Sequence, residues 1–445
     1  MDVSSKYFAL FRNPGPNLLR HLWRFWLDIR RVGKARELFS FILWEITHRL
    51  YLYRFSNRYI QFTKHAGLSL VQPGAIFDQT LSSSFLLEHD WCFRALAIDW
   101  KFCLQATDGR WWGNCFSNPN EVYCSENLDQ SVTLVHTFKH PITSLFISRQ
   151  NDLFVCSQGI VYKKDSQGTC FKSVLQFSSS ISYFLFNNGM TELPDGTLLI
   201  GEYGSVWQGQ TWQNLAFLYS SSDGGETWEV SDFLIRQGVN KHIHLVRYSP
   251  LLKAVLLTDG DNKKQLWMNQ ILTDCNESMA FPIADWHLLT QYHHQTGGYT
   301  AVAETKEAVL FGSDYLGGTN FIVKTTDGKR FQKLVLPDPY RRSPVMNMVS
   351  RESYAGSEVW SVSYSCLSES ARSLLMCTLD GGKSWNRVLD FDGTKYEVRL
   401  VNSAVSGSAE LFISITEFGS HSDNHRHQVY KLESRYMYSQ HQHLM

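Results

Sequence analysis

The sequence lacks closely paired cysteines. Its nine cysteines stand singly, their number is odd, and none belongs to a Cys-x-x-Cys motif. Secreted disulfide scaffolds and zinc ribbons use even numbers or close pairs of cysteines, so both classes are disfavoured. We therefore expect reduced thiols and a cytoplasmic protein.

The sequence also lacks a long apolar run and a secretory signal. The run FSFILW (39–44) is far shorter than the roughly 20 residues that a spanning helix needs. The opening MDVSSKYFAL has no basic start followed by an apolar stretch and a cleavage site, so we expect no signal peptide. Charged residues are only 19% of the chain and aromatic residues 14%, which predicts a large folded core rather than disorder.

Charge is distributed unevenly although the formal net charge is zero. Residues 1–64 contain twelve Lys or Arg and four Asp or Glu, a balance of +8, and the remainder carries −8. Residues 17–55 repeat apolar side chains at helical spacing, which predicts one helix before Gly33 and a second from about 34 to 53. We define residues 1–66 as a basic amphipathic helical arm and residues 67–445 as the main domain.

The arm has three interpretations. Its tryptophans and arginines are typical of a helix at a membrane surface. The same pattern also fits helices that pack on a partner protein, or on the main domain. Residues 1–60 thus predict attachment to a membrane surface or a protein, and peripheral membrane localisation is the alternative to a purely cytoplasmic one. Nothing in the main domain indicates nucleic acid binding.

From about residue 67 the pattern changes to short strand-like runs. A pair of such runs recurs seven times. One residue in the second strand of each pair serves as an anchor: Gln105, Cys156, Gly201, Thr258, Gly312, Val362 and Ser414. The intervals are 45–57 residues, room for about four strands. This period predicts an all-β fold, a single β-propeller of seven four-stranded blades, with six blades as the alternative.

The last blade requires a strand from elsewhere. The segment HQVYKLES (427–434) would be its third strand, and a fourth would come from the N-terminal side, around GLSLV (67–71) or SFLLEH (84–89). Such a strand would close the ring.

A turn motif recurs between the third and fourth strands. YSSSDGGETWEV (219–230) and MCTLDGGKSWNRV (376–388) share Ser or Thr, Asp, two glycines and a Trp at the same positions. Asp223 and Asp380 are short acceptors suited to backbone N–H groups of the turn, and the glycines permit positive φ. We predict that these aspartates support the fold, and that Trp228 and Trp385 are buried. VKTTDGKRFQKLV (323–335) and VYKKDSQGTCFKSV (161–174) are partial copies.

These turns resemble the Asp-box, or BNR repeat, of the sialidase superfamily. The resemblance implies a propeller whose Asp-box turns lie opposite the substrate face, and it extends to non-enzymatic members. Sialidases are usually six-bladed and hold their substrate's carboxylate with three arginines. Arg94, Arg247 and Arg399 fall in predicted first strands and are the candidates here, but no Tyr–Glu nucleophile pair is marked by a motif.

Acidic side chains follow the predicted second strands with regularity. They are Asp108, Glu202, Asp259 with Asp261, Asp314 and Glu417. Because the ends of equivalent strands lie on the same face of a propeller, we expect these acidic side chains around one funnel. We predict Glu202, Asp259 and Asp314 as catalytic carboxylates, and Tyr203, His242, His244, Asp261, Tyr315 and Glu417 as substrate-binding residues. We expect no cofactor; a divalent metal at His242 and His244 is the weaker alternative.

Two functions follow from this pattern. The first is a carbohydrate-active propeller, a relative of glycoside hydrolases or lyases acting on a complex or acidic glycan. The alternative is a non-catalytic propeller that binds a glycan or protein and is tethered by its helical arm. Carboxylates about 5–10 Å apart in a pocket would favour the enzyme, and a channel filled by side chains would favour the binding protein.

Overall fold

A computed structural model describes most of the chain. The described residues are 15–31, scattered positions from 33 to 63, residues 67–71, 85–86, and 91–434 with gaps at 129–130, 210–211, 240, 261–264, 271–284, 291–298, 317, 354–355, 403–409 and 420–424. Two helices are described, α2 (Leu18–Arg31) and the short α5 (Phe233–Arg236). Helix α2 confirms a short N-terminal helix ahead of Gly33. The predicted helix at 34–53 lies for the most part outside the described residues.

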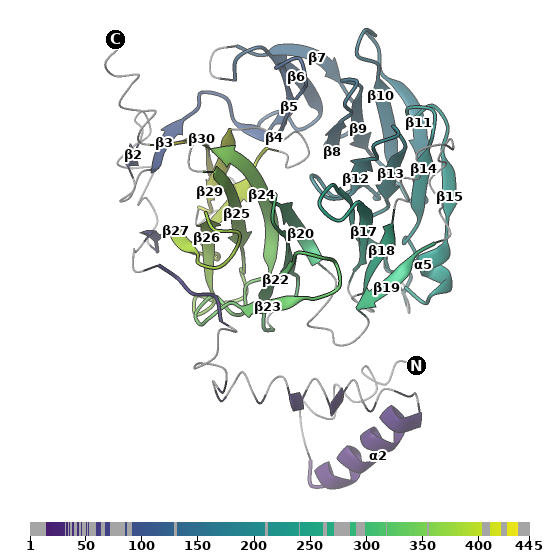
Figure 1. The fold of residues 1–445 in the computed structure, drawn as a ribbon, viewed down its shortest axis with the longest axis vertical. Helices are drawn as coiled ribbons and strands as arrows, with labels where there is room; N and C mark the ends of the chain where they lie inside the picture. Colours follow the sequence, from purple (N-terminus) through teal and green to yellow (C-terminus); the bar gives the residue numbers. More distant parts are fainter. Residues whose placement is uncertain are drawn as a thin grey trace.

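Seven sheets, each built on four antiparallel strands, form a ring (Figure 1), which confirms the prediction of a seven-bladed propeller. Blade 1 contains β4 (Trp100–Gln105), β5 (Trp111–Cys115), β6 (Glu121–Ser125) and β7 (Thr133–Thr137). Blade 2 contains β8 (Ile142–Ile147), β9 (Leu153–Ser157), β10 (Ile160–Lys164) and β11 (Lys172–Gln176). Blade 3 contains β12 (Met190–Glu192), β13 (Leu198–Gly201), β14 (Leu218–Ser221) and β15 (Glu229–Ser231). Blade 4 contains β16 (Ile243–Ser249), β17 (Ala254–Asp259), β18 (Leu266–Gln270) and β19 (His287–Thr290).

Two of the remaining three blades, blades 6 and 7, include strands from the N-terminal part of the chain. Blade 5 contains β20 (Tyr299–Glu304), β21 (Val309–Ser313), β22 (Phe321–Thr325) and β23 (Gln332–Val335). Blade 6 contains β24 (Val345–Ser353), β25 (Gly356–Ser363), β26 (Arg372–Thr378), β27 (Asn386–Asp392) and β1 (Leu68–Leu70). Blade 7 contains β28 (Tyr396–Leu400), β29 (Leu411–Glu417), β30 (Arg426–Ser434), β3 (Trp91–Ala95) and β2 (Phe85–Leu86).

The closing strand differs from both segments that the sequence analysis proposed. Strand β3 pairs antiparallel with β30 and is the fourth strand of blade 7. GLSLV instead supplies β1, which pairs parallel with β27 of blade 6, and SFLLEH supplies β2, a fifth strand beyond β3. The ring is therefore closed from the N-terminal side, as expected, but by a later segment.

The first predicted strand pair is also shifted by one strand. The segment RALAIDWKFCLQATDG contains the last strand of blade 7 and the first strand of blade 1, so Gln105 ends a first strand rather than a second. Arg94 accordingly lies on β3 and not on a first strand. The other six pairs are the first two strands of blades 2–7, as predicted.

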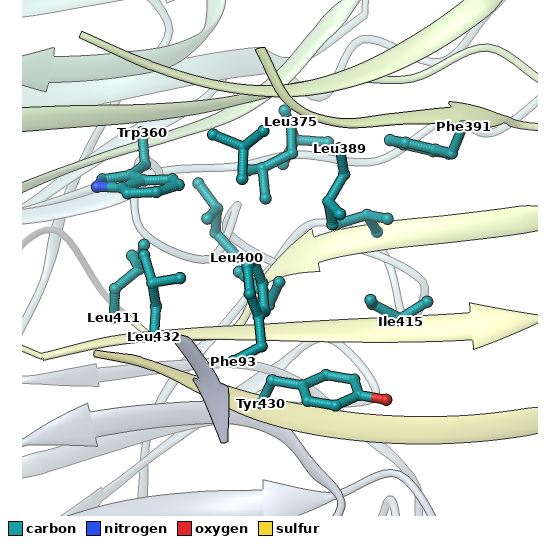
Figure 2. Packing of buried hydrophobic residues seen from close by; sticks show 14 of the residues in the cluster. Phe93, Trp360, Leu375, Leu389, Phe391, Leu400, Leu411, Ile415, Tyr430 and Leu432 are labelled. Atoms are coloured by element: carbon teal, nitrogen blue, oxygen red, sulfur yellow. The ribbon is translucent and has the colours of Figure 1, made fainter. Parts of the chain in front are cut away.

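The core lies between neighbouring blades. Each inner strand has a blade on both sides, and β9, β17 and β29 are buried at every residue. Figure 2 shows the cluster between blades 6 and 7, where Trp360 and Leu375 face Leu411 and Tyr430. Burial from both sides explains why these strands read as apolar runs rather than alternating ones.

Connections alternate between the two faces of the ring, because consecutive strands are antiparallel. We call the face with the turns joining first to second and third to fourth strands the turn face. We call the opposite face, with the loops joining second to third strands and one blade to the next, the loop face.

A segment ahead of the ring is attached to its outer edge. Ile60 N–H donates to the carbonyl of Val335 (2.8 Å), and Thr63 N–H donates to that of Trp385 (2.9 Å). We call the described residues 59–63 and 67–71 the strap, since they lie along the outer strands of blades 5 and 6. The strap begins before position 66, where the sequence analysis ended the arm.

Candidate functional site

The repeated aspartates organise turns on the turn face. Asp223 accepts hydrogen bonds from Glu226 N–H (3.0 Å), Thr227 N–H (3.0 Å) and the Thr227 hydroxyl (2.6 Å). Asp380 repeats this geometry, with Ser384 in the place of Thr227. These bonds stabilise the ionised carboxylate and hold the pKa of Asp223 far below its usual range. All are contacts within the turn, as expected of a scaffold.

The predicted acidic residues do not all share one face. Glu202, Asp259, Asp314 and Glu417 follow or end second strands and so lie on the loop face. Asp108 lies in the turn between β4 and β5, on the turn face, where it pairs with Arg110 (2.6 Å). The prediction for Asp108 is wrong because the first strand pair was shifted by one strand. Asp261 lies outside the described residues.

Glu202 is fully buried within blade 3. Its carboxylate accepts from the Ser178 hydroxyl (2.5 Å) and the Tyr219 hydroxyl (2.7 Å). Tyr219 is on the third strand, so the Glu202 side chain points into the blade. Burial, followed by the neighbouring charge of Glu202, raises the pKa of Tyr219, so this Tyr–Glu contact does not supply an ionised phenolate.

His242 and His244 form a buried pair at the start of β16. Their Nε2 atoms lie 3.0 Å apart, so one ring donates and the other accepts. Tyr203 packs on His242 with ring centres 4.1 Å apart. A Cβ at Gly260 would lie 2.5 Å from the His242 ring, so only glycine fits there.

This histidine pair is a poor fit to a metal site. In the described ranges, no three His, Cys, Asp or Glu side chains are arranged to hold a metal ion. The two facing nitrogens already bond to each other, and Asp259 accepts from the backbone N–H of Gln265. We derive no metal chemistry from the pair.

The other predicted residues have separate surroundings. Tyr315 N–H donates to the side chain of Asn320 (2.9 Å), and both Tyr315 and its neighbour Asp314 are half-buried. Glu417 is buried at the end of β29, opposite Tyr396. The side-chain hydrogen bonds of Glu202 go to Ser178 and Tyr219, and Asp259 accepts from Gln265, so these carboxylates bind neighbouring protein groups.

The central channel is crossed by a tight turn that the sequence analysis did not predict. Residues 184–189 precede β12, and Asn187 adopts φ 74°. The Asn187 side-chain amide donates to the carbonyl of Asn402 on blade 7 (3.2 Å), and that of Asn188 donates to Thr300 on blade 5 (2.7 Å). We call residues 184–189 the plug, because they join blades on opposite sides of the ring.

Exposed apolar side chains gather on the loop face. We call seven of them the apolar rim: Phe116, Ile181, Trp207, Trp212, Leu316, Met346 and Leu367. Trp207 is 55% exposed and packs edge-on against Trp212, over which Lys241 Nζ lies 4.2 Å from the ring centre. Two tryptophans around a glycine in VWQGQTW (206–212) could have marked this pair in the sequence.

Comparison with known proteins supports the fold and goes no further. The sequence matches no family model and no curated protein. A streptogramin B lyase structure has a TM-score of 0.51 and 13% identity, covering 78% of this chain and 98% of that one. An inactive virginiamycin B lyase from Staphylococcus aureus with quinupristin has a TM-score of 0.49 and 12% identity, covering 77% and 98%. YCF48 bound to a D1 peptide has a TM-score of 0.46 and 12% identity, covering 78% and 98%. At such identities the likeness concerns architecture alone: the chain is a seven-bladed β-propeller.

Proposed function

We propose that this chain is a non-catalytic binding propeller whose loop face docks a protein partner. The observation that carries the proposal is an asymmetry between the faces. Among described residues beyond position 55, twelve large apolar side chains are exposed. Of these twelve described side chains, seven form the apolar rim of the loop face, and one, Leu379, lies in a turn of the turn face. Apolar side chains clustered on one face mark interaction sites, whereas scattered ones carry no such meaning.

The composition of the rim favours a protein over a glycan. Ile181, Leu316, Met346 and Leu367 offer no hydrogen bonds to sugar hydroxyls, whereas aliphatic and aromatic side chains together are typical of protein interfaces. Trp207 and Trp212 are the residue type most often found at interface hot spots. We therefore propose that Trp207 and Trp212 contribute most of the binding energy.

The carboxylates support binding rather than glycoside hydrolysis. Hydrolysis needs two carboxyl groups that face one ligand, about 5–10 Å apart. Glu202 and Asp259 are fully buried and accept hydrogen bonds from neighbours, and Glu417 is also buried. The plug joins blades 5 and 7 across the channel where a funnel would hold a substrate. The likeness to sialidases accordingly rests on the aspartate turns alone.

The helical arm is proposed as a tether to a membrane surface or an assembly. Helix α2 exposes Leu19, Leu22, Trp23 and Leu27, while Arg20, Arg24 and Arg31 lie on the adjoining face. In the described part of the chain, no helix is long and apolar enough to cross a bilayer. A helix of this kind can lie in the plane of the interface.

The proposal is tested by weakening the rim without touching the core. Trp207→Ser combined with Trp212→Ser should reduce the affinity for a partner captured by wild-type protein at least tenfold, measured by calorimetry with both proteins purified. Leu134→Ser combined with Val230→Ser is the matched control, because these side chains are exposed on outer strands. Equal losses in both variants, or no loss in the rim variant, would refute the loop face as the docking site.

A second experiment, with glycans, separates binding from catalysis. Wild type and Glu202→Gln are incubated with a glycan panel, and released sugars are measured by mass spectrometry. We expect no turnover by either protein, and a lower midpoint of thermal unfolding for the variant, because a neutral amide weakens the bonds from Ser178 and Tyr219. Turnover that is present in wild type and lost in a folded Glu202→Gln variant would establish the hydrolase instead.

A further inference from the structure

We propose that the centre of the loop face is an anion-binding basin, and that it takes a single carboxylate of the protein partner. The basin is formed by Lys101, Arg399 and Tyr183 above the plug. This inference rests on the proposed function and specifies the chemistry that the partner must present.

The two cations lie on innermost strands of neighbouring blades. Lys101 is the second residue of β4, and Arg399 lies on β28. The strands meet where Cys103 N–H donates to the carbonyl of Val401 (3.1 Å). Because first strands begin at the loop face, Lys101 lies near the mouth of the channel.

The plug closes the basin from below. Asn187 binds the carbonyl of Asn402, three residues beyond Arg399 towards the turn face. Arg247 donates to the carbonyl of Asn187 (3.2 Å), which fixes the plug from blade 4. Tyr183 stands at the start of the plug, held to Tyr203 by a pair of backbone hydrogen bonds. With the plug on its inner side, we place the entry of a ligand at the loop face.

Lys101 carries a charge without a counter-charge. Its Nζ makes one long hydrogen bond, 3.4 Å, to the carbonyl of Ile142 and lies 5.2 Å from the centre of the Phe102 ring, and no described carboxylate lies within 4 Å of it. Burial lowers the pKa of Lys101, and the positive charge of Arg399 lowers it further. Half-buried charges are normally paired, so an anion would satisfy Lys101 and relieve its repulsion with Arg399.

The positive charge of Arg399 is already partly neutralised by an ion pair. Its guanidinium pairs with Glu397 at 2.7 Å, while its side chain remains half exposed. With one carboxylate against two cations, these three side chains hold a net charge of +1. This charge matches one carboxylate better than the nearly two negative charges of a phosphate. An Arg fork and a Lys ammonium together are suited to such a group.

The surroundings define the rest of the ligand. The basin lies at the centre of the loop face and the apolar rim lies on the loops around it, so a bound segment would present an acidic side chain with apolar neighbours. An extended peptide of the type Trp-Glu-Leu combines these features.

The first test compares matched peptides. Acetyl-Trp-Glu-Leu-amide and its Gln counterpart differ only in charge, and binding to the full-length protein is measured by NMR titration. We expect the Glu peptide to bind at least fivefold more tightly to wild type, and Lys101→Gln or Arg399→Gln to abolish the difference. Lys383→Gln, which removes an exposed lysine from the turn face, should preserve it. Equal binding of the two peptides to wild type, or no binding by either, would overturn the basin.

Two further experiments distinguish a carboxylate ligand from a phosphate, and the basin from the rest of the docking face. If a phosphoserine peptide binds more tightly than the Glu peptide, the assignment to a carboxylate is overturned. With the purified partner, Lys101→Gln should weaken binding tenfold and reduce its dependence on salt. A partner that binds Lys101→Gln as tightly as wild type but loses affinity for the Trp207/Trp212 variant would overturn the basin and leave the docking face intact. A partner indifferent to both variants would overturn the proposed function itself.

Discussion

Single side chains of the same type serve different purposes according to the groups around them. Trp385 and Trp228 occupy the same position in their turns, yet Trp385 is fully buried between blades 5 and 6. Trp228 is only partly buried, and its Nε1 donates to the carbonyl of Gly225 (3.2 Å). The expectation of burial therefore holds fully for Trp385 and only in part for Trp228.

This difference predicts unequal stability losses. Trp385→Ala should lower the free energy of unfolding by about 3–5 kcal/mol, because it leaves a cavity in a packed cluster. Trp228→Ala should cost about 1–2 kcal/mol, since part of its ring is already in water. Urea unfolding followed by circular dichroism measures both. Equal losses would show that exposure does not distinguish the two sites.

His427 is the clearest titrating group of the loop face. Its Nδ1 contacts the Thr416 hydroxyl (2.8 Å), and its ring stacks on Phe116 with centres 4.3 Å apart. Burial, with a smaller contribution from Arg399, lowers the pKa of His427 to about 4, while Asp99 opposes the shift. The folded state therefore disfavours the protonated ring.

Stability should consequently fall as the pH is lowered from about 6.5 to 4. In this window the unfolded chain binds a proton that the folded chain does not, which amounts to at most about 3 kcal/mol. Substituting His427→Gln should flatten the pH dependence of the unfolding midpoint, whereas His425→Gln, at an exposed position, should not. An unchanged slope in His427→Gln would place the titration elsewhere.

Residue identity alone could not separate structural from functional carboxylates. Glu202 follows a second strand just as the pattern predicts, but its partners Ser178 and Tyr219 are 24 and 17 residues away in the chain. The direction of a side chain after a strand depends on such contacts, which periodicity does not encode. The aspartates of the turns were predictable because their partners lie within four residues.

Among the structural elements, the strap contributes contacts that the repeat pattern does not contain. Backbone bonds join Trp385 to Gln61 and Thr63, and the Thr63 hydroxyl donates to Asn386 (2.8 Å). Ile60 is buried in the cluster that contains Trp385. The outer strands of blades 5 and 6 are thereby covered, which protects exposed sheet edges.

Truncations on either side of the strap should behave differently. Removing residues 1–56 should leave the unfolding midpoint of the propeller nearly unchanged. Removing 1–66 should destabilise it by about 3 kcal/mol, since it deletes several hydrogen bonds and the burial of Ile60. Differential scanning calorimetry distinguishes the two proteins. If both are equally stable, the strap is not part of the folded domain.

The arm predicts binding to anionic membranes. Full-length protein should cosediment with vesicles of mixed anionic and neutral lipid, and Leu19→Ser combined with Trp23→Ser should abolish this, because both side chains are exposed on α2. Neutral vesicles and the Leu134→Ser variant are the controls. Wild-type protein that ignores anionic vesicles would favour a protein assembly as the tether's target.

Strand periodicity predicted six of the seven strand pairs, and the exception has a simple cause. Only residues 96–99 separate β3 from β4, a connection as short as a hairpin turn, although the two strands belong to different blades. Sequence spacing cannot distinguish a short connection between blades from a turn within one. Strands β1 and β2, which the sequence analysis proposed as closing strands, instead extend blades 6 and 7 as fifth strands.

At the scale of the whole molecule, the ring gives its two faces different chemistry. Among the described residues, the turn face includes short polar turns held by Asp108, Asp223, Asp327 and Asp380, whereas the loop face carries the apolar rim around a basic centre. Ring closure by β3 joins blades 1 and 7, the two blades that supply Lys101 and Arg399. The basin thus exists only in the closed propeller, which explains why linear motifs did not reveal it.

Hydrogen–deuterium exchange of the complex with its partner is the most direct test of the loop face as a docking surface. We predict that the partner slows amide exchange in the loop-face segments 116–120, 178–183, 203–209 and 364–370, while the turns at 223–228 and 380–385 exchange as in the free protein. Protection of those turns or of the outer strands, with unchanged exchange in the four loops, would contradict the account.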